Sequence, residues 1–142
     1  MTSIVETISS SWRDRYLLTQ VGSHKLIFSA QIVSDILTIE RTQVLTLPFY
    51  PQAVLGVVHY LGKIVPLVSA VSFFPQEQQS LYHHNLITIR LNGLVGTAVG
   101  VGVIVNELVG SITTEQIAQE RIFQPSDLPP NLWKPQRWYS DK

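Results

Sequence analysis

The four histidines, His24, His59, His83 and His84, are the first candidates for chemistry, because imidazole binds metals and transfers protons near neutral pH. A metal site needs several converging ligands, usually with carboxylate or thiolate help. The adjacent His83 and His84 point in opposite directions in an extended segment, and no acidic residue adjoins them. We therefore expect solvated loop histidines and no metal site.

Catalytic and cofactor-binding patterns are also missing from the sequence. The chain has no cysteine, no G-x-S-x-G and no H-E-x-x-H. The glycines of VGTAVGVGVIV (95–105) lie in a strand-like run without a surrounding βαβ unit, which indicates a structural role. Asp35 and Glu107 stand at expected strand starts, where solvated or hydrogen-bonded acids are ordinary. We predict a protein that is not an enzyme and needs no cofactor.

Nucleic-acid binding is the weakest alternative. Cations and aromatic rings alternate only in residues 133–139, a pattern that suits stacking on bases. The chain has ten basic and ten acidic residues and a formal net charge of zero, whereas a dedicated nucleic-acid binder carries a basic excess. The same segment is better explained as a tail that packs on its own domain or on a protein partner.

The composition suits one compact domain. Of the 142 residues, 45% are hydrophobic and only 14% are charged, which excludes a disordered chain. The N-terminus lacks the basic start and apolar run of a signal peptide. The longest apolar run (94–105) is shorter than the roughly 20 residues of a membrane-spanning helix. We expect a soluble, cytoplasmic protein without direct membrane insertion.

Short apolar runs bounded by turn residues recur along the chain and predict an all-β sandwich or barrel. Hairpin corners are expected at Gly22-Ser23 and at Asn92-Gly93, because Asn-Gly tolerates the positive φ of a type I′ turn. The expected strands are RYLLTQV (15–21), KLIFS (25–29), SDILTI (34–39), VLGVVHY (54–60), KIVPLVSA (63–70), NLITIRL (85–91), LVGTAVG (94–100) and VNELVGSI (105–112).

The stretch VLGVVHYLGKIVPLVSA (54–70) is predicted to be a hairpin rather than a broken helix. Gly56 and Gly62 weaken a helix, and Pro66 removes a helical hydrogen bond. β-branched residues fill most other positions and favour extended backbone. Pro66 is expected on an edge strand or at a bulge.

A weak internal repeat relates LLTQVGSHKLIFSAQIVSDILTI to LITIRLNGLVGTAVGVGVIVNELVGSI. Each copy predicts a hairpin, a connector and a third strand, which indicates two related half-barrels. We divide the chain into an N-terminal extension (1–14), a first half (15–71), a linker (72–84), a second half (85–122) and a tail (123–142). Thr113 and Gln116 have the spacing of a capping box before a short helical turn.

The order of these elements resembles the CheW-like coupling proteins of bacterial chemosensory systems. The family's signature hairpin, commonly GVINLRGxIIPVVDL, is similar to residues 56–69, and VNELVGSITTEQI is similar to its second-half segment. The resemblance covers residues 15–122. It implies two small SH3-like β-barrels around a shared hydrophobic core and no active site. It also implies an adaptor in signal transduction that joins a chemoreceptor's cytoplasmic tip to a histidine kinase regulatory domain, which is itself CheW-like.

The resemblance also implies partner-binding residues. By family position, the kinase side comprises Val33, Asp35 and Gly56, and the receptor side comprises Tyr60, Leu61 and Lys63. The family's Asn-Leu-Arg before the turn glycine is replaced by His59-Tyr60-Leu61. Leucine cannot supply the planar, multi-donor recognition of the family arginine.

A typical member of the family closes its second barrel with a final hairpin, and residues 123–142 do not provide one. The second barrel is therefore expected to be incomplete, with an unpaired edge. The tail covers this edge with Leu132, Trp133 and Trp138, or a partner does. The leading prediction is an adaptor that joins a histidine kinase, or another CheW-like protein, to a sensory complex. The alternative is a diverged assembly or regulatory subunit for motility or pilus control, whose incomplete second barrel pairs with another chain, as in a homo-oligomer.

Overall fold

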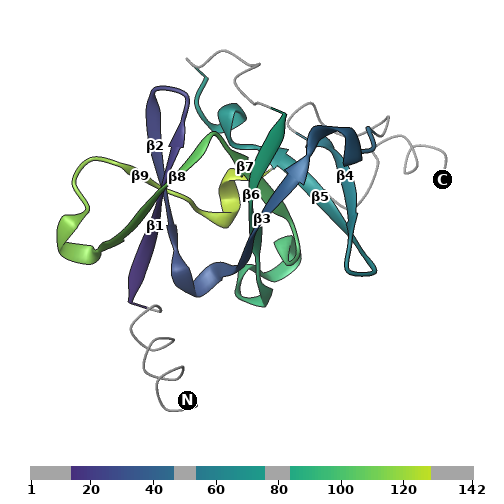
Figure 1. The fold of residues 1–142 in the computed structure, drawn as a ribbon. Coiled ribbons are helices and arrows are strands. Elements are labelled where there is room, and N and C mark those ends of the chain that lie inside the picture. Colours follow the sequence, from purple (N-terminus) through teal and green to yellow (C-terminus); the bar gives the residue numbers. More distant parts are fainter. Residues whose placement is uncertain (1–13, 47–53, 76–83, 129–142) are drawn as a thin grey trace, which may run out of the picture.

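The described part of the chain is built from β-strands and short 3-10 turns. The computed structural model describes residues 14–46, 54–75 and 84–128. These residues form two β-sheets of four and five strands, with no α-helix among them (Figure 1). The prediction of an all-β protein is confirmed.

Seven of the predicted runs form strands, the run 94–100 does not, and the strands Gly102–Val105 and Arg121–Ile122 were not predicted. The five-stranded sheet has the order β3-β6-β7-β5-β4, and the four-stranded sheet has the order β8-β1-β2-β9. The bounds are β1 (Arg15–Val21), β2 (His24–Ser29), β3 (Val33–Glu40), β4 (Val54–Tyr60), β5 (Lys63–Ser69), β6 (Asn85–Leu91), β7 (Gly102–Val105), β8 (Glu107–Thr113) and β9 (Arg121–Ile122).

The two copies of the repeat exchange strands between the sheets. After the β1–β2 hairpin, β3 crosses to the other sheet and pairs with β6. After β6 and β7, β8 crosses back and pairs with β1. β5 runs parallel to β7, and β9 runs parallel to β2 in the same relation. Each sheet therefore contains strands from both halves of the sequence.

The five-stranded sheet closes on itself, and we call it the complete barrel. Leu45 donates its N–H to the Val57 carbonyl at 2.8 Å and accepts the Val57 N–H at 2.9 Å, which joins β4 to the chain beyond β3. We call the four-stranded sheet the half-barrel. It has the two-residue β9 in the place of β5 and, among the described residues, no counterpart of β4. Within residues 14–46, 54–75 and 84–128, the second barrel is incomplete, as expected.

Two clusters of buried apolar side chains stabilise this arrangement. The shared core lies between the sheets, and its most buried members come from both of them. The second cluster lies inside the complete barrel, and we call it the barrel interior. It comprises Leu37, Ile39, Val58, Val65, Leu67, Leu86 and Ile104. The shared core includes Leu17, Val21, Leu26, Phe28, Val68, Ile89, Leu91, Val101, Val103 and Val105.

Residues beyond β9 also belong to the shared core. Phe123 and Leu128 are only 2% and 8% exposed. The Phe123 ring stacks on Phe28 with 5.0 Å between centroids and contacts Phe73 at 5.9 Å. Phe123 and Leu128, in the predicted tail (123–142), thus pack on the domain itself. Leu132, Trp133 and Trp138 lie outside the described residues.

The strand predicted at 94–100 is wrong. Residues Gly93–Ala98 form consecutive 3-10 turns, and Asn92-Gly93 is not a type I′ corner. The reason is the Asn92 side chain, which accepts the Leu94 N–H at 2.9 Å and donates to the Gln31 carbonyl at 2.6 Å. These bonds stabilise a turn in place of a strand ladder. The corner predicted at Gly22-Ser23 is present, with Gly22 at φ 59°.

The hairpin predicted at 54–70 is confirmed, but the reason why Pro66 fits differs from the prediction. β5 is an interior strand, not an edge strand. Val57, opposite Pro66, directs both its N–H and its C=O to Leu45, so β4 needs no bond from Pro66. On the other side, β7 pairs with β5 only from Leu67 onward. The missing N–H of proline therefore costs no ladder bond.

Gly56 is required by the closure of the complete barrel. A Cβ at this position would lie 2.4 Å from the Leu45 carbonyl oxygen, and φ is +157°. We predict that Gly56→Ala lowers the free energy of unfolding by more than about 2 kcal/mol, measured by urea denaturation. Gly110→Ala is the matched control, because nothing lies within 4 Å of its added Cβ. Equal midpoints for the two variants would contradict this account.

Candidate functional site

The turn between β4 and β5 presents a strained and exposed leucine. Leu61 and Gly62 have φ angles of 49° and 78°, the signs that a type I′ turn requires. Among the described residues, Leu61 is the only non-glycine residue with positive φ. A leucine in this conformation costs about 1 kcal/mol, and its side chain is 78% exposed. The strain gains no packing within the described part of the chain.

An ion pair lies at the same end of the complete barrel. Arg90 on β6 donates from Nε to Oδ1 of Asp35 at 2.7 Å and from Nη2 to Oδ2 at 3.2 Å. Its Cζ lies 5.5 Å from the ring centroid of Tyr60, within cation–π range. Lys63 is exposed and pairs with Tyr60 across the hairpin. We call Asp35, Tyr60, Leu61, Lys63 and Arg90 the barrel mouth.

The other expected kinase-side residues do not present side chains at the barrel mouth. Val33 packs partly buried against the shared core. Gly56 is buried, and its close approach to Leu45 is sufficient to explain the glycine. The structure therefore brings together one residue from the expected kinase side, Asp35, and the three from the expected receptor side.

Arg90 was not predicted as a site residue. It is the single charged residue of the strand NLITIRL, and a partly buried charge in a strand needs an opposite charge nearby. The isolated charge in this strand was visible in the sequence, but its role could be recognised only once Asp35 was known to be its partner. That pairing follows from β3 crossing to the sheet of β6, which the division into sequential halves did not predict.

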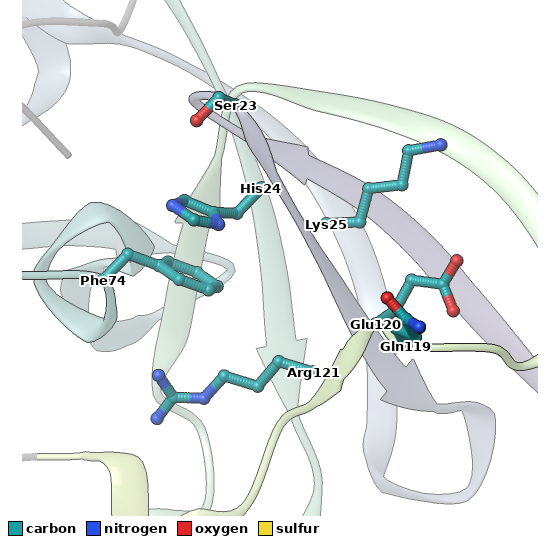
Figure 2. A pocket seen from close by; sticks show the side chains of 7 residues that line it. All are labelled: Ser23, His24, Lys25, Phe74, Gln119, Glu120 and Arg121. Atoms are coloured by element: carbon teal, nitrogen blue, oxygen red, sulfur yellow. The ribbon is translucent and has the colours of Figure 1, made fainter. Parts of the chain in front are cut away.

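A shallow depression of about 340 Å³ lies beside the half-barrel (Figure 2). Figure 2 shows the Phe74 ring between the His24 imidazole, stacked at 4.6 Å, and the Arg121 side chain, whose Cζ is 5.3 Å from the ring. Arg121 also donates to the Phe73 carbonyl and to Asp127. The aromatic and basic groups are thus bonded to one another, and this packing gives no evidence of a ligand.

The described residues contain no group of three or more His, Cys, Asp and Glu side chains that could hold a metal ion. Of the part of the chain that the structure describes, no helix is long and apolar enough to cross a membrane. The barrel mouth, with the exposed Leu61 beside the Asp35–Arg90 ion pair, is the candidate site.

The strain at Leu61 is measurable. We predict that Leu61→Asn raises the free energy of unfolding by about 0.5–1 kcal/mol, because asparagine tolerates positive φ far better than leucine. Leu94→Asn is the control, since Leu94 is 73% exposed without positive φ. Thermal unfolding of both variants compares them, and equal shifts would show that exposure rather than strain is responsible.

Glu120, at the edge of the depression, predicts a pH dependence. Its carboxylate accepts the Ala118 N–H at 2.8 Å, and this bond, its own backbone N–H and nearby Lys25 lower the pKa of Glu120. A lowered pKa in the folded state means stabilisation that is present at neutral pH and lost as pH falls through that pKa. The stability difference between the native chain and Glu120→Ala should therefore shrink below about pH 4.

Glu120→Gln serves as the control, because its amide oxygen accepts the same bond without titrating in this range. Urea denaturation at a series of pH values gives both comparisons. A difference between native and Glu120→Ala that stays constant from about pH 7 to about pH 3 would contradict the assignment.

Known proteins share this fold. The chain is similar to the scaffolding protein TtCheW from Thermoanaerobacter tengcongensis, with 14% sequence identity and a TM-score of 0.58, over 71% of this chain and 65% of that chain. At this identity the likeness shows the fold alone. No curated protein matches the chain. The family model of the CheW-like domain matches residues 15–132, past the end of β9 and through Phe123 and Leu128. This match spans most of the sequence, and the chain therefore belongs to the CheW-like domain family.

Proposed function

We propose that this protein is a non-enzymatic adaptor of a bacterial chemosensory system in the cytoplasm. It couples a histidine kinase regulatory domain, or another CheW-like protein, to a chemoreceptor tip or a related sensory complex. Membership of the CheW-like family supports the scaffold role. The single observation that carries the proposal is Leu61, which is strained and exposed at the barrel mouth.

The Leu61 side chain is both conformationally strained and apolar in water. A left-handed leucine is unfavourable by about 1 kcal/mol, and asparagine or glycine would remove that cost. An exposed apolar side chain gains nothing in water, but gains free energy when a partner buries it. Ile64, two residues after the turn glycine, is also 52% exposed. The hairpin end therefore offers apolar surface beside the cation Lys63, a composition suited to a protein partner.

The half-barrel favours a second candidate, an assembly subunit that pairs with another chain. Its edge strand β8 pairs only with β1 among the described residues, and Val109 on it is 50% exposed. An edge strand with an exposed apolar residue is a template for strand addition. For the assembly subunit too, the proposed role is contact with another protein rather than catalysis.

The experiment measures binding of the purified kinase regulatory domain to the full chain by calorimetry. We expect a complex at tens of micromolar or tighter, as for transient signalling contacts, and about tenfold weaker binding by Leu61→Asn. Leu94→Asn should bind like the native chain.

Absence of binding by a folded sample would sink the adaptor proposal. Equal affinity of Leu61→Asn and the native chain would remove the turn from the interface. Light scattering on the same samples addresses the second candidate, because a mass above that of the monomer favours assembly through the half-barrel.

A further inference from the structure

Arg90 joins two residues that the family resemblance assigns to different partners. Its bidentate contact with Asp35 has the fork geometry in which Arg–carboxylate pairs are strongest. Nη2 also lies 3.5 Å from the Ser34 hydroxyl. The side chains of Arg90 and Asp35 are 16% and 34% exposed, so solvent screens this pair less than a fully exposed one. The expected kinase-side carboxylate is therefore held in one orientation.

Tyr60, expected on the receptor side, is the second partner of the same guanidinium. Its ring centroid is 5.5 Å from Cζ of Arg90, and its ring packs partly buried against the barrel interior. Leu61 follows directly at the start of the turn. Arg90 therefore also orients Tyr60, the residue directly before the exposed Leu61.

The proximity of these groups limits how partners can use them. Asp35 and Tyr60 both contact one guanidinium. A specific interface covers roughly 800 Å² on each partner, which corresponds to a patch roughly 30 Å across. A partner whose interface is centred on Asp35 thus also covers Tyr60.

We propose that Arg90 is a positioning residue that makes Asp35, Tyr60 and the turn a single binding surface, contacted by one partner at a time. On the proposed function, that partner is the histidine kinase regulatory domain, whereas the coupling through Arg90 does not depend on the partner. The second partner of an adaptor then binds a different face of the molecule. Lysine cannot replace Arg90, because one ammonium group cannot form the fork to Asp35 and face the Tyr60 ring together.

The first test needs no partner. The ring resonances of Tyr60 are measured by NMR in the full native chain and in Asp35→Asn, Arg90→Lys and Glu107→Gln. Glu107 is the matched control, an exposed acid at the start of β8 in the other sheet. We expect the first two variants to shift the Tyr60 resonances and Glu107→Gln to leave them in place. Tyr60 resonances that do not respond to Asp35→Asn would overturn the proposal.

The second test measures binding of the kinase regulatory domain by Asp35→Asn, Tyr60→Ala and the double variant. If they share one surface through Arg90, each single variant weakens binding about tenfold and the double variant loses clearly less than about a hundredfold. Losses that multiply fully would show two independent contacts and would overturn the proposal. If the native chain does not bind this domain, the adaptor function fails, and the Tyr60 resonances alone decide the role of Arg90.

Discussion

Two hydrogen bonds between Leu45 and Val57 determine much of the structure. They turn a five-stranded sheet into a barrel, and they leave no space for a side chain at Gly56. Closure shields the barrel interior, in which Val65 and Leu67 are nearly inaccessible to water. It also fixes β4 and β5, and with them the turn at Leu61. The exposed, strained end of the hairpin is possible because the rest of it is anchored on both sides.

Among the described residues, the half-barrel has no counterpart of β4, and side chains bond backbone groups near its edges. Arg15 on β1 donates from Nε to the hydroxyl of Ser111 on β8 and from Nη2 to the Ser111 carbonyl, both at 3.0 Å. Before β9, at the other edge of the sheet, the Glu120 carboxylate accepts a hydrogen bond from the Ala118 N–H. Charged side chains thus bond backbone groups close to the open edges, as edge strands in stable proteins commonly require. Phe123 and Leu128, which follow β9, are buried members of the shared core.

Structural features determined by neighbouring residues could be predicted from the sequence, whereas features determined by contacts between distant residues could not. The hairpin at 54–70 was predictable because glycine, proline and β-branched residues act within a few positions. The capping box at Thr113 and Gln116 is present for the same reason. The type I′ corner predicted at Asn92-Gly93 was wrong because the Asn92 side chain bonds to Gln31, far away in the sequence. Arg90 was missed because its meaning comes from Asp35 on a strand of the other repeat, and no spacing along the chain shows that contact.

The exchange of strands between the repeats has a consequence for how the chain acquires its structure. β1, at the start of the described residues, pairs with β8, and Arg15 and Ser111 are 96 positions apart. Neither sheet can be assembled from one half of the sequence. Loop closure over such distances must precede the contacts that reward it, which slows folding of a β-protein. During synthesis, the first hairpin therefore waits with an unpaired edge until β8 emerges, and that interval is when this chain is most open to aggregation or to a chaperone.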